Sequence, residues 1–257
     1  MKFMKNHFRV ACLPDGRAML NLGCSARVAE HWNNIDFSLL LRIGQHPAFC
    51  SLFFRIGLLN KPRYERIKKL AGQLIVWDLK KGIPFADKMF DVVYHSHVLE
   101  HIDREHALDF LNECHRVLKP GGTIRIVVPD FELLAKQYLD VVRHMPDTAD
   151  IDVHEAAVAK IIDQMVLRVP RERAKAGALV RLLENILLGD TAKSGNLHRW
   201  MYDRLSLAAA LEDSCFHNPQ VLDEKRSAII GWNDFQLDTE PDGSPYKHNS
   251  LYMEATK

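Results

Sequence analysis

Short apolar runs alternate with helical patterns over the first half of the chain. The runs that predict strands are Ala18–Leu22, Asn34–Phe37, Gln73–Trp77, Asp91–Tyr94 and Thr123–Val128. Between them, apolar residues recur at helical spacing in Lys61–Leu70 and Glu105–Leu118. Because strands that alternate with helices form parallel sheets, this half of the chain predicts a parallel α/β sheet with helices on its faces.

Three segments of this half call for separate interpretation. Only about ten residues separate Gly23 from the second predicted strand, so we expect the first helix to be abbreviated to a turn or two. Pro120-Gly121-Gly122 predicts a turn that ends one helix and begins the next strand. The most apolar stretch, Phe49–Leu59, is too short to span a bilayer and contains Arg55, so it predicts a buried or capping helix.

Helical periodicity with many charges dominates residues 131–195. The helices it predicts are Glu132–Val142, Ile151–Val169 and Arg171–Leu188. An insertion after the fifth strand lies near the carboxyl edge of a parallel sheet, where a substrate cap would sit, although a helical subdomain that only packs is an equal alternative. We therefore expect a single domain over residues 1–257 with a helical insertion at 131–195 that caps the carboxyl edge.

The sheet pattern resumes after the insertion. Tyr202–Cys215 predicts a helix, and short apolar runs follow at Gln220–Leu222, Ala228–Trp232 and Ser250–Ala255. Glu240-Pro241-Asp242-Gly243 predicts a turn, so we expect the last two runs to form an antiparallel hairpin.

Composition narrows the class of protein. A net charge of +1 gives no global attraction to nucleic acid, and no nucleic-acid partner is expected. The five cysteines are scattered and form no Cys-x-x-Cys pair, which fits a reducing, cytoplasmic setting and argues against a cysteine zinc site. No segment reads as a transmembrane span. The sequence does not indicate an oligomeric state.

Candidate ligand-binding residues follow the predicted strands. Gly23 breaks the first apolar run, and Asp36 ends the second. Asp78 and Leu79 end the third, and His95-Ser96-His97 ends the fourth. The carboxyl ends of parallel strands share one edge, where nucleotide-like ligands bind. There a carboxylate could accept from a ribose diol or an exocyclic amine, and a leucine could pack on a flat ring.

Taken together, these motifs resemble the class I S-adenosylmethionine-dependent methyltransferases. The matching residues are Leu20-Asn21-Leu22-Gly23-Cys24, Pro84-Phe85-Ala86-Asp87, Phe90-Asp91-Val92-Val93, His97-Val98-Leu99-Glu100-His101 and Arg116-Val117-Leu118-Lys119-Pro120-Gly121-Gly122. The resemblance implies a doubly wound, Rossmann-like sheet of seven mostly parallel strands, the final one antiparallel. It also implies S-adenosylmethionine as cofactor and methyl transfer to an O- or N-nucleophile on a small or medium-sized molecule. Such enzymes often act on sugars or other secondary metabolites.

The resemblance also implies roles for individual residues. The loop under the methionine part of the cofactor would consist of Asn21, Gly23, Cys24 and Ser25. Asp36 would bind the ribose hydroxyls, Asp78 the adenine amine and Leu79 the ring face, while His95 and Ser96 would offer backbone groups beside the sulfonium. A hydroxyl acceptor needs a base, for which we select His97 first and His198 second.

Two other functions remain open from the sequence. The family usually has an acidic residue at the position of Asn21 and glycine at that of Ser25, which allows a catalytically inactive methyltransferase fold that binds a ligand or partner. His97, Glu100 and His101 match the His-x-x-Glu-His pattern of zinc hydrolases, which on a helix places both histidines on one face. No further ligand is marked out, Glu172 and Glu184 being only guesses, so we expect no metal.

Overall fold

A seven-stranded sheet organises the molecule. The computed structural model describes residues 8–37, 42, 45–70, 72–144, 151–166 and 198–257. Its strands are β1 (Met19–Leu22), β2 (Asn33–Asp36), β3 (Ile75–Val76), β4 (Phe90–Ser96), β5 (Leu118–Pro129), β6 (His217–Leu222) and β7 (Ser250–Thr256). Their order is β3-β2-β1-β4-β5-β7-β6, with the first five parallel and β7 antiparallel to both of its neighbours. The predicted mostly parallel α/β sheet is confirmed.

The helices lie close to their predicted positions. The α-helices are α2 (Pro47–Arg55), α3 (Lys61–Leu70), α4 (Arg104–Val117), α5 (Phe131–His144), α6 (Ile151–Val166) and α8 (Arg204–Asp213). Three short 3-10 helices are η1 (Leu79–Lys81), η2 (Leu99–His101) and η3 (Trp232–Phe235). The predicted helix Arg171–Leu188 lies outside the described residues.

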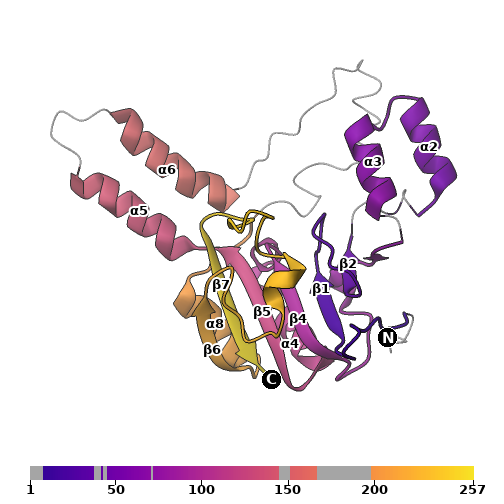
Figure 1. Cartoon of the computed structure of the whole chain (residues 1–257). Coiled ribbons are helices and arrows are strands. Elements are labelled where there is room, and N and C mark those ends of the chain that lie inside the picture. The colour runs from indigo at the N-terminus through magenta and orange to yellow at the C-terminus, as the bar shows by residue number, and fades with distance from the viewer. Residues whose placement is uncertain (1–7, 38–41, 43–44, 71, 145–150, 167–197) are drawn as a thin grey trace.

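The two faces of the sheet are covered differently. One face is covered by α4 and α8 (Figure 1). These helices bury an aliphatic core around Val93, Leu111 and Leu207. On the other face, Tyr94 packs with Trp32 from a loop and with Trp232 from the 3-10 helix η3. Successive strand side chains point to opposite faces, so neighbouring strand residues feed two separate cores. The carboxyl ends of the strands stay available for the site.

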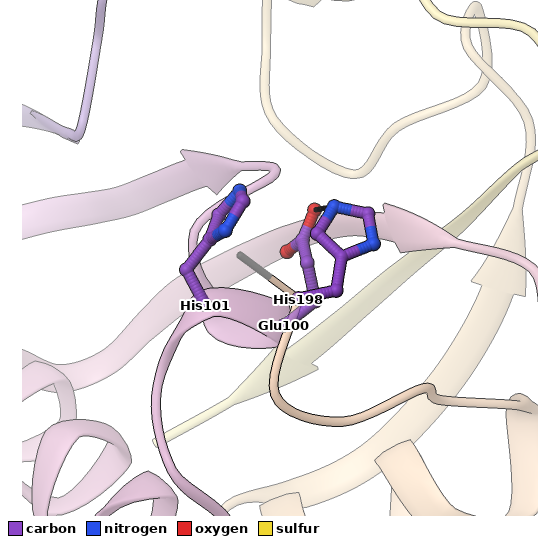
Figure 2. Close-up of side chains that lie close together, drawn as sticks. All are labelled: Glu100, His101 and His198. Carbon is purple, nitrogen blue, oxygen red and sulfur yellow. Dashed lines mark ion pairs between the residues drawn. The ribbon is translucent and has the colours of Figure 1, made fainter. Parts of the chain in front are cut away.

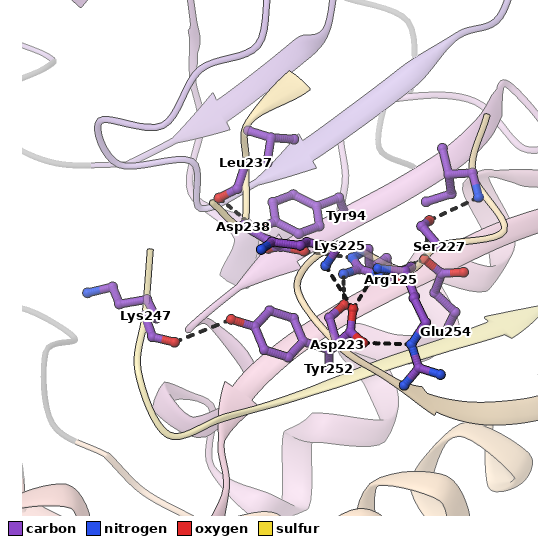
Figure 3. A network of polar contacts seen from close by, with 12 residues as sticks. Tyr94, Arg125, Asp223, Lys225, Ser227, Leu237, Asp238, Lys247, Tyr252 and Glu254 are labelled. Carbon is purple, nitrogen blue, oxygen red and sulfur yellow. Dashed lines mark hydrogen bonds and ion pairs between the residues drawn. The ribbon is translucent and has the colours of Figure 1, made fainter. Parts of the chain in front are cut away.

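A buried charge network fastens the C-terminal loop to this second face (Figure 3). Arg125 is fully buried, and its guanidinium donates to Asp238 and to Glu254 at 2.7 Å each. The hydroxyl of Tyr94 donates to Asp238 at 2.6 Å. The same guanidinium lies 4.6 Å from the ring centroid of Trp232. Charges buried this deeply need such partners, so the loop and the sheet depend on each other.

Three local predictions were wrong. Residues 23–32, all of which the structure describes, form turns and no helix, because the connection is too short for one. Pro120-Gly121-Gly122 lies within β5, where register shifts between Phe90 and Val92 of β4 mark a bulge in the pairing and Gly121 takes a φ of +76°. A glycine in that conformation absorbs the extra residues without ending the strand.

The expected C-terminal hairpin is also absent. The run Ala228–Trp232 forms no strand, and β7 pairs with β5 and β6 instead. The turn at Glu240–Gly243 is present, but it joins only Thr239 and Pro245 in an isolated bridge. Only Ile229 and Trp232 of this run are buried, where they pack in the aromatic core on the sheet face, while Ile230 is exposed.

The insertion begins with a pair of helices. α5 and α6 pack on each other and extend outward from the end of β5 (Figure 1). Residues 145–150 and 167–195 of the insertion lie outside the described part of the chain, so a cap over the carboxyl edge stays a prediction. In the part of the chain that the structure describes, no helix is both long enough and apolar enough to span a membrane.

Candidate functional site

The predicted cofactor residues gather at the carboxyl ends of four adjacent strands. Leu22 of β1 is in register with His95 of β4, and Asp36 of β2 with Val76 of β3. The loop after β1, the end of β2, the segment after β3 and the end of β4 therefore follow one another along a single edge of the sheet. This is the edge at which parallel sheets bind nucleotide-like ligands.

The turn after β1 requires a glycine. Gly23 has a φ of +65°, and a Cβ atom built there would lie 2.4 Å from a methyl carbon of Val98. Val98 comes from the segment after β4, so the two strand ends touch at this point. The following residue, Cys24, donates its N–H to the carbonyl of Ile35 at 3.0 Å, which ties the loop to β2. Both contacts hold the loop close to its neighbouring strands.

Asn21 and Ser25, the two residues that depart from the family pattern, both have a role in holding the loop after β1. Asn21 is buried, and its amide donates to the carbonyl of Arg27 at 2.8 Å and to Asn34 at 3.1 Å, so this side chain holds the loop together. Ser25 adopts a φ of +50°, the left-handed region that glycine usually occupies. Its hydroxyl accepts a 3.0 Å hydrogen bond from the exposed Arg66 of α3. The loop thus keeps a glycine-like backbone with serine in place, at a modest conformational cost.

Asp36 carries the carboxylate nearest to this loop. Burial raises the pKa of Asp36 above its ordinary value, although hydrogen bonds from the backbone of Phe37 and Ser25 and the charge of Arg66 oppose the shift. The N–H of Phe37 donates to one carboxylate oxygen. A half-buried acceptor beside a glycine loop suits a diol that donates two hydrogen bonds.

The segment after β3 brings Asp78 and Leu79 to the same edge. The N–H of Trp77 donates to the carbonyl of Asp36 at 3.0 Å, which continues the pairing of the two strands. Asp78 caps η1 by accepting from the N–H of Lys80 at 3.0 Å. Leu79 is half-buried. The two residues lie beside the end of β2, as adenine recognition would require.

His95 and Ser96 end β4, but the His95 side chain belongs to the core. Its ring is fully buried and meets Phe110 of α4 edge-on at 5.3 Å. Burial lowers the pKa of His95 to about 4, with the charge of Glu100 opposing the shift, so the ring is neutral near pH 7. Only backbone groups at this position could meet a cofactor, as the resemblance implies.

His97 lies between a carboxylate and a hydroxyl. Its Nδ1 is 2.9 Å from Oε1 of Glu100, and its Nε2 is 3.1 Å from Oγ of Ser250, the first residue of β7. His97 also has a φ of +54°, a conformation that costs free energy in a non-glycine residue and is often found at functional sites. The carboxylate favours the proton on Nδ1, which leaves the lone pair on Nε2. A base with this orientation can accept a proton.

Glu100 is the centre of a wider polar cluster (Figure 2). Its carboxylate is fully buried, and Oε1 lies 3.8 Å from Nε2 of His198. The rings of His101 and His198 are 4.8 Å apart. Burial acts to raise the pKa of Glu100, but the hydrogen bond and charge of His97, and then the charge of His101, outweigh it and hold the pKa below its ordinary value. Glu100 is therefore ionised at neutral pH.

Sequence reasoning missed this convergence. It named His97 and His198 separately, and it placed His97 and His101 on one helix face for the zinc-hydrolase alternative. In the structure His97 follows directly after β4, and only Leu99–His101 form the short 3-10 helix η2, so that helix face does not exist. The two guessed ligands, Glu172 and Glu184, lie outside the described residues. No signal in the sequence paired Glu100 with His198.

The residues after His198 divide between surface and core. Trp200 is partly exposed, and the guanidinium of Arg104 lies 4.3 Å from its ring centroid. Tyr202 is buried in the core that α4 and α8 cover. Burial, with the charge of Glu100, raises the pKa of Tyr202 to about 12. Of these three residues, His198 is the one whose side chain pairs with the Glu100 carboxylate.

Comparison with known proteins matches one segment of the chain to a family model. Residues 59–126 match a family model described as a methyltransferase domain. The match takes in β3, β4, η2, α4 and most of β5, which include the His97–His101 segment, and the strand order agrees with the sheet that the resemblance implies. This part of the chain is therefore similar to a methyltransferase domain. The matched segment does not include the Gly23 loop or Asp36.

Three solved structures are distantly similar to this chain. A S-adenosylmethionine-dependent methyltransferase from Thermotoga maritima is 12% identical over 95% of this chain and 84% of that one, with a TM-score of 0.42. One from Archaeoglobus fulgidus is 12% identical over 94% and 86%, also at 0.42. One from Methanosarcina mazei is 14% identical over 100% and 97%, again at 0.42. A search of curated proteins finds no match.

Proposed function

We propose that this protein transfers a methyl group from S-adenosylmethionine to an oxygen or nitrogen nucleophile of a small or medium-sized molecule, with His97 as the base. The observation that carries the proposal is the placement of His97 at the end of β4, with Nδ1 against a buried carboxylate and Nε2 on a hydroxyl. Bound S-adenosylmethionine supplies a methyl carbon that its sulfonium makes electrophilic.

The chain itself would contribute alignment and proton removal. Asp36 would accept from the ribose hydroxyls, and Asp78 with Leu79 would hold the adenine, which together fix the direction of the methyl group. Alignment of this kind accounts for much of the rate of a displacement between two bound partners. His97 would take the acceptor's proton on Nε2, while Glu100 stabilises the resulting imidazolium. A positioned base of this kind contributes about 10²–10⁴-fold.

Calorimetry on the full chain tests cofactor binding first. We expect S-adenosylmethionine and S-adenosylhomocysteine to bind the native protein. Asp36→Ala should bind both compounds at least about tenfold more weakly, because it loses roughly one charge-assisted hydrogen bond. Asp15→Ala is the matched control, because Asp15 is an exposed carboxylate that pairs with Arg17. A native protein that binds neither compound would contradict the proposal.

Methyl transfer to a panel of hydroxyl, amine and carboxylate acceptors tests turnover. Transfer to any member of the panel that depends on His97 supports the assigned base. Binding of the cofactor without transfer to any acceptor would favour the alternative of an inactive methyltransferase fold that acts as a binding module.

A further inference from the structure

The polar cluster around Glu100 contains a set of groups that suits a metal ion. Glu100, His101 and His198 each offer one ligand atom, and these atoms lie within 4.8 Å of one another. They come from two segments about a hundred residues apart in the sequence, joined in space by the fold (Figure 2). We propose that these three residues bind a divalent transition-metal ion such as Zn²⁺ beside the methyl-transfer site.

Main-chain hydrogen bonds hold the His198 segment against η2. The N–H groups of Arg199 and Trp200 both donate to the carbonyl of Glu100, at 2.6 and 3.3 Å. His198 is therefore carried to the carboxylate by main-chain bonds that do not depend on its side chain. On the other side of η2, Val98 packs on Gly23. The ligands are anchored by the same contacts that build the cofactor loop.

The carboxylate has unused capacity. Glu100 is fully buried, and its Oε1 faces Nδ1 of His97 at 2.9 Å. Its Oε2 is buried without a hydrogen-bond partner among the described residues. Buried carboxylate oxygens nearly always have partners, so an oxygen left over in the interior calls for one. A metal ion on Oε2, with His97 on Oε1, would satisfy both.

The ligand set selects the class of metal. Two imidazoles and one carboxylate suit Zn²⁺, Fe²⁺ and neighbouring ions, and three protein ligands leave coordination positions open. Bond lengths of about 2.0–2.2 Å place ligand atoms roughly 3–4 Å apart, so the two rings would have to rotate slightly inward. His101 is only partly buried, which leaves its ring room to move.

An open position would take the acceptor. An acceptor oxygen or nitrogen bound to the metal would lie near His97. Acceptors that suit this arrangement carry a hydroxyl, a carboxylate or a vicinal pair of such groups. This assignment of the open position rests on the proposed function. The metal site itself does not, since it concerns only three side chains of the chain.

Zinc binding by the purified full chain tests the site. After treatment with a chelator and removal of it, we expect one Zn²⁺ per chain by elemental analysis and calorimetry, and a higher midpoint of thermal unfolding with Zn²⁺ than without. His101→Ala should weaken zinc binding at least about 100-fold, because even partners outside the coordination sphere contribute 10–100-fold. His198→Ala should do the same if it folds.

A control variant at another histidine tests whether zinc binding is specific to the Glu100, His101 and His198 site. His106→Ala, an exposed histidine on α4, should bind Zn²⁺ like the native protein. Absence of stoichiometric zinc from the native protein would overturn the proposal, as would equal affinity in His101→Ala and His106→Ala. Cofactor calorimetry on the same zinc-free protein reports on the proposed function separately, so either idea can fail alone.

Discussion

Nδ1 of His97 lies 2.9 Å from Oε1 of Glu100, and this pairing decides which nitrogen of the ring is available for chemistry. The carboxylate is fully buried, so it cannot exchange His97 for water without a large cost. The other nitrogen, Nε2, points to the hydroxyl of Ser250 at 3.1 Å. Both ring nitrogens of His97 therefore have partners. His97 follows β4, the strand that pairs with β1 and its glycine loop.

Loss of His97 should separate binding from turnover. In His97→Ala we expect unchanged affinity for S-adenosylmethionine by calorimetry and a fall in turnover of about 10²–10⁴-fold, the usual contribution of a positioned base. Unchanged turnover would remove His97 from the mechanism.

Ser250 should matter much less than His97. Ser250→Ala removes one neutral hydrogen bond, which is worth about 1 kcal/mol, so we expect turnover within about tenfold of the native value. A loss as large as that of His97→Ala would mean that the serine hydroxyl itself takes part in the chemistry. Steady-state rates for the two variants with the same acceptor make this comparison.

Gly23→Ala should impair the fold and the cofactor site together. The new Cβ would lie 2.4 Å from a methyl of Val98, and the residue would keep a φ of +65°, which costs an L-residue about 1–2 kcal/mol by itself. Gly16→Ala is the matched control, since Gly16 also has a positive φ but nothing within 4 Å of a new Cβ.

Denaturant unfolding and cofactor calorimetry measure both effects. We expect Gly23→Ala to lose more stability than Gly16→Ala, and only Gly23→Ala to lose affinity for S-adenosylmethionine. Adding Val98→Ala to Gly23→Ala should recover part of the stability. Equal losses in the two single variants would show that the close approach of Val98 is unimportant.

Removal of Arg125 should destabilise the molecule strongly. Arg125→Met leaves the carboxylates of Asp238 and Glu254 buried without their shared cation, which typically costs 3–5 kcal/mol. Lys136→Met removes a solvent-exposed partner of Glu132 on α5 and should change the free energy of unfolding by less than about 0.5 kcal/mol. Urea unfolding of both variants gives the comparison, and similar values would contradict a structural role for the network.

His95 should make stability depend on pH between about 4 and 6.5. Burial lowers the pKa of His95 to about 4 in the folded protein, against an ordinary value of 6.5, so the unfolded chain binds a proton first as the pH falls. The folded state is then fully stabilised above pH 6.5 and loses roughly 3 kcal/mol by pH 4 from this group, at about 1.4 kcal/mol per unit.

His95→Phe isolates that contribution. The difference in unfolding free energy between native protein and variant should change by about 3 kcal/mol from pH 7 to pH 4, because phenylalanine does not titrate. His106→Phe, at an exposed position, should leave the native pH dependence in place. A pH-independent difference for His95→Phe would contradict the assigned protonation state.

Much of the architecture was predictable from local patterns. The alternation of apolar runs and helical periodicity located five parallel strands, and the polar residues after those strands located one edge of the sheet. These features are readable because period and strand-end chemistry are properties of short segments. The errors at Pro120–Gly122 and at Ala228–Trp232 arose where pairing partners, and not local preference, decided the backbone.

The sequence by itself determined the sheet and the line of residues Gly23, Asp36 and Asp78 along its edge, because parallel strands carry whatever follows them to the same side. Tertiary structure alone decided three other relationships: Val98 on Gly23, Arg125 between Asp238 and Glu254, and His198 against Glu100. Each joins segments that are far apart in the chain. Which distant side chains come into contact depends on tertiary packing and on the pairing of buried charges, and the local periodicity of the sequence does not encode these contacts.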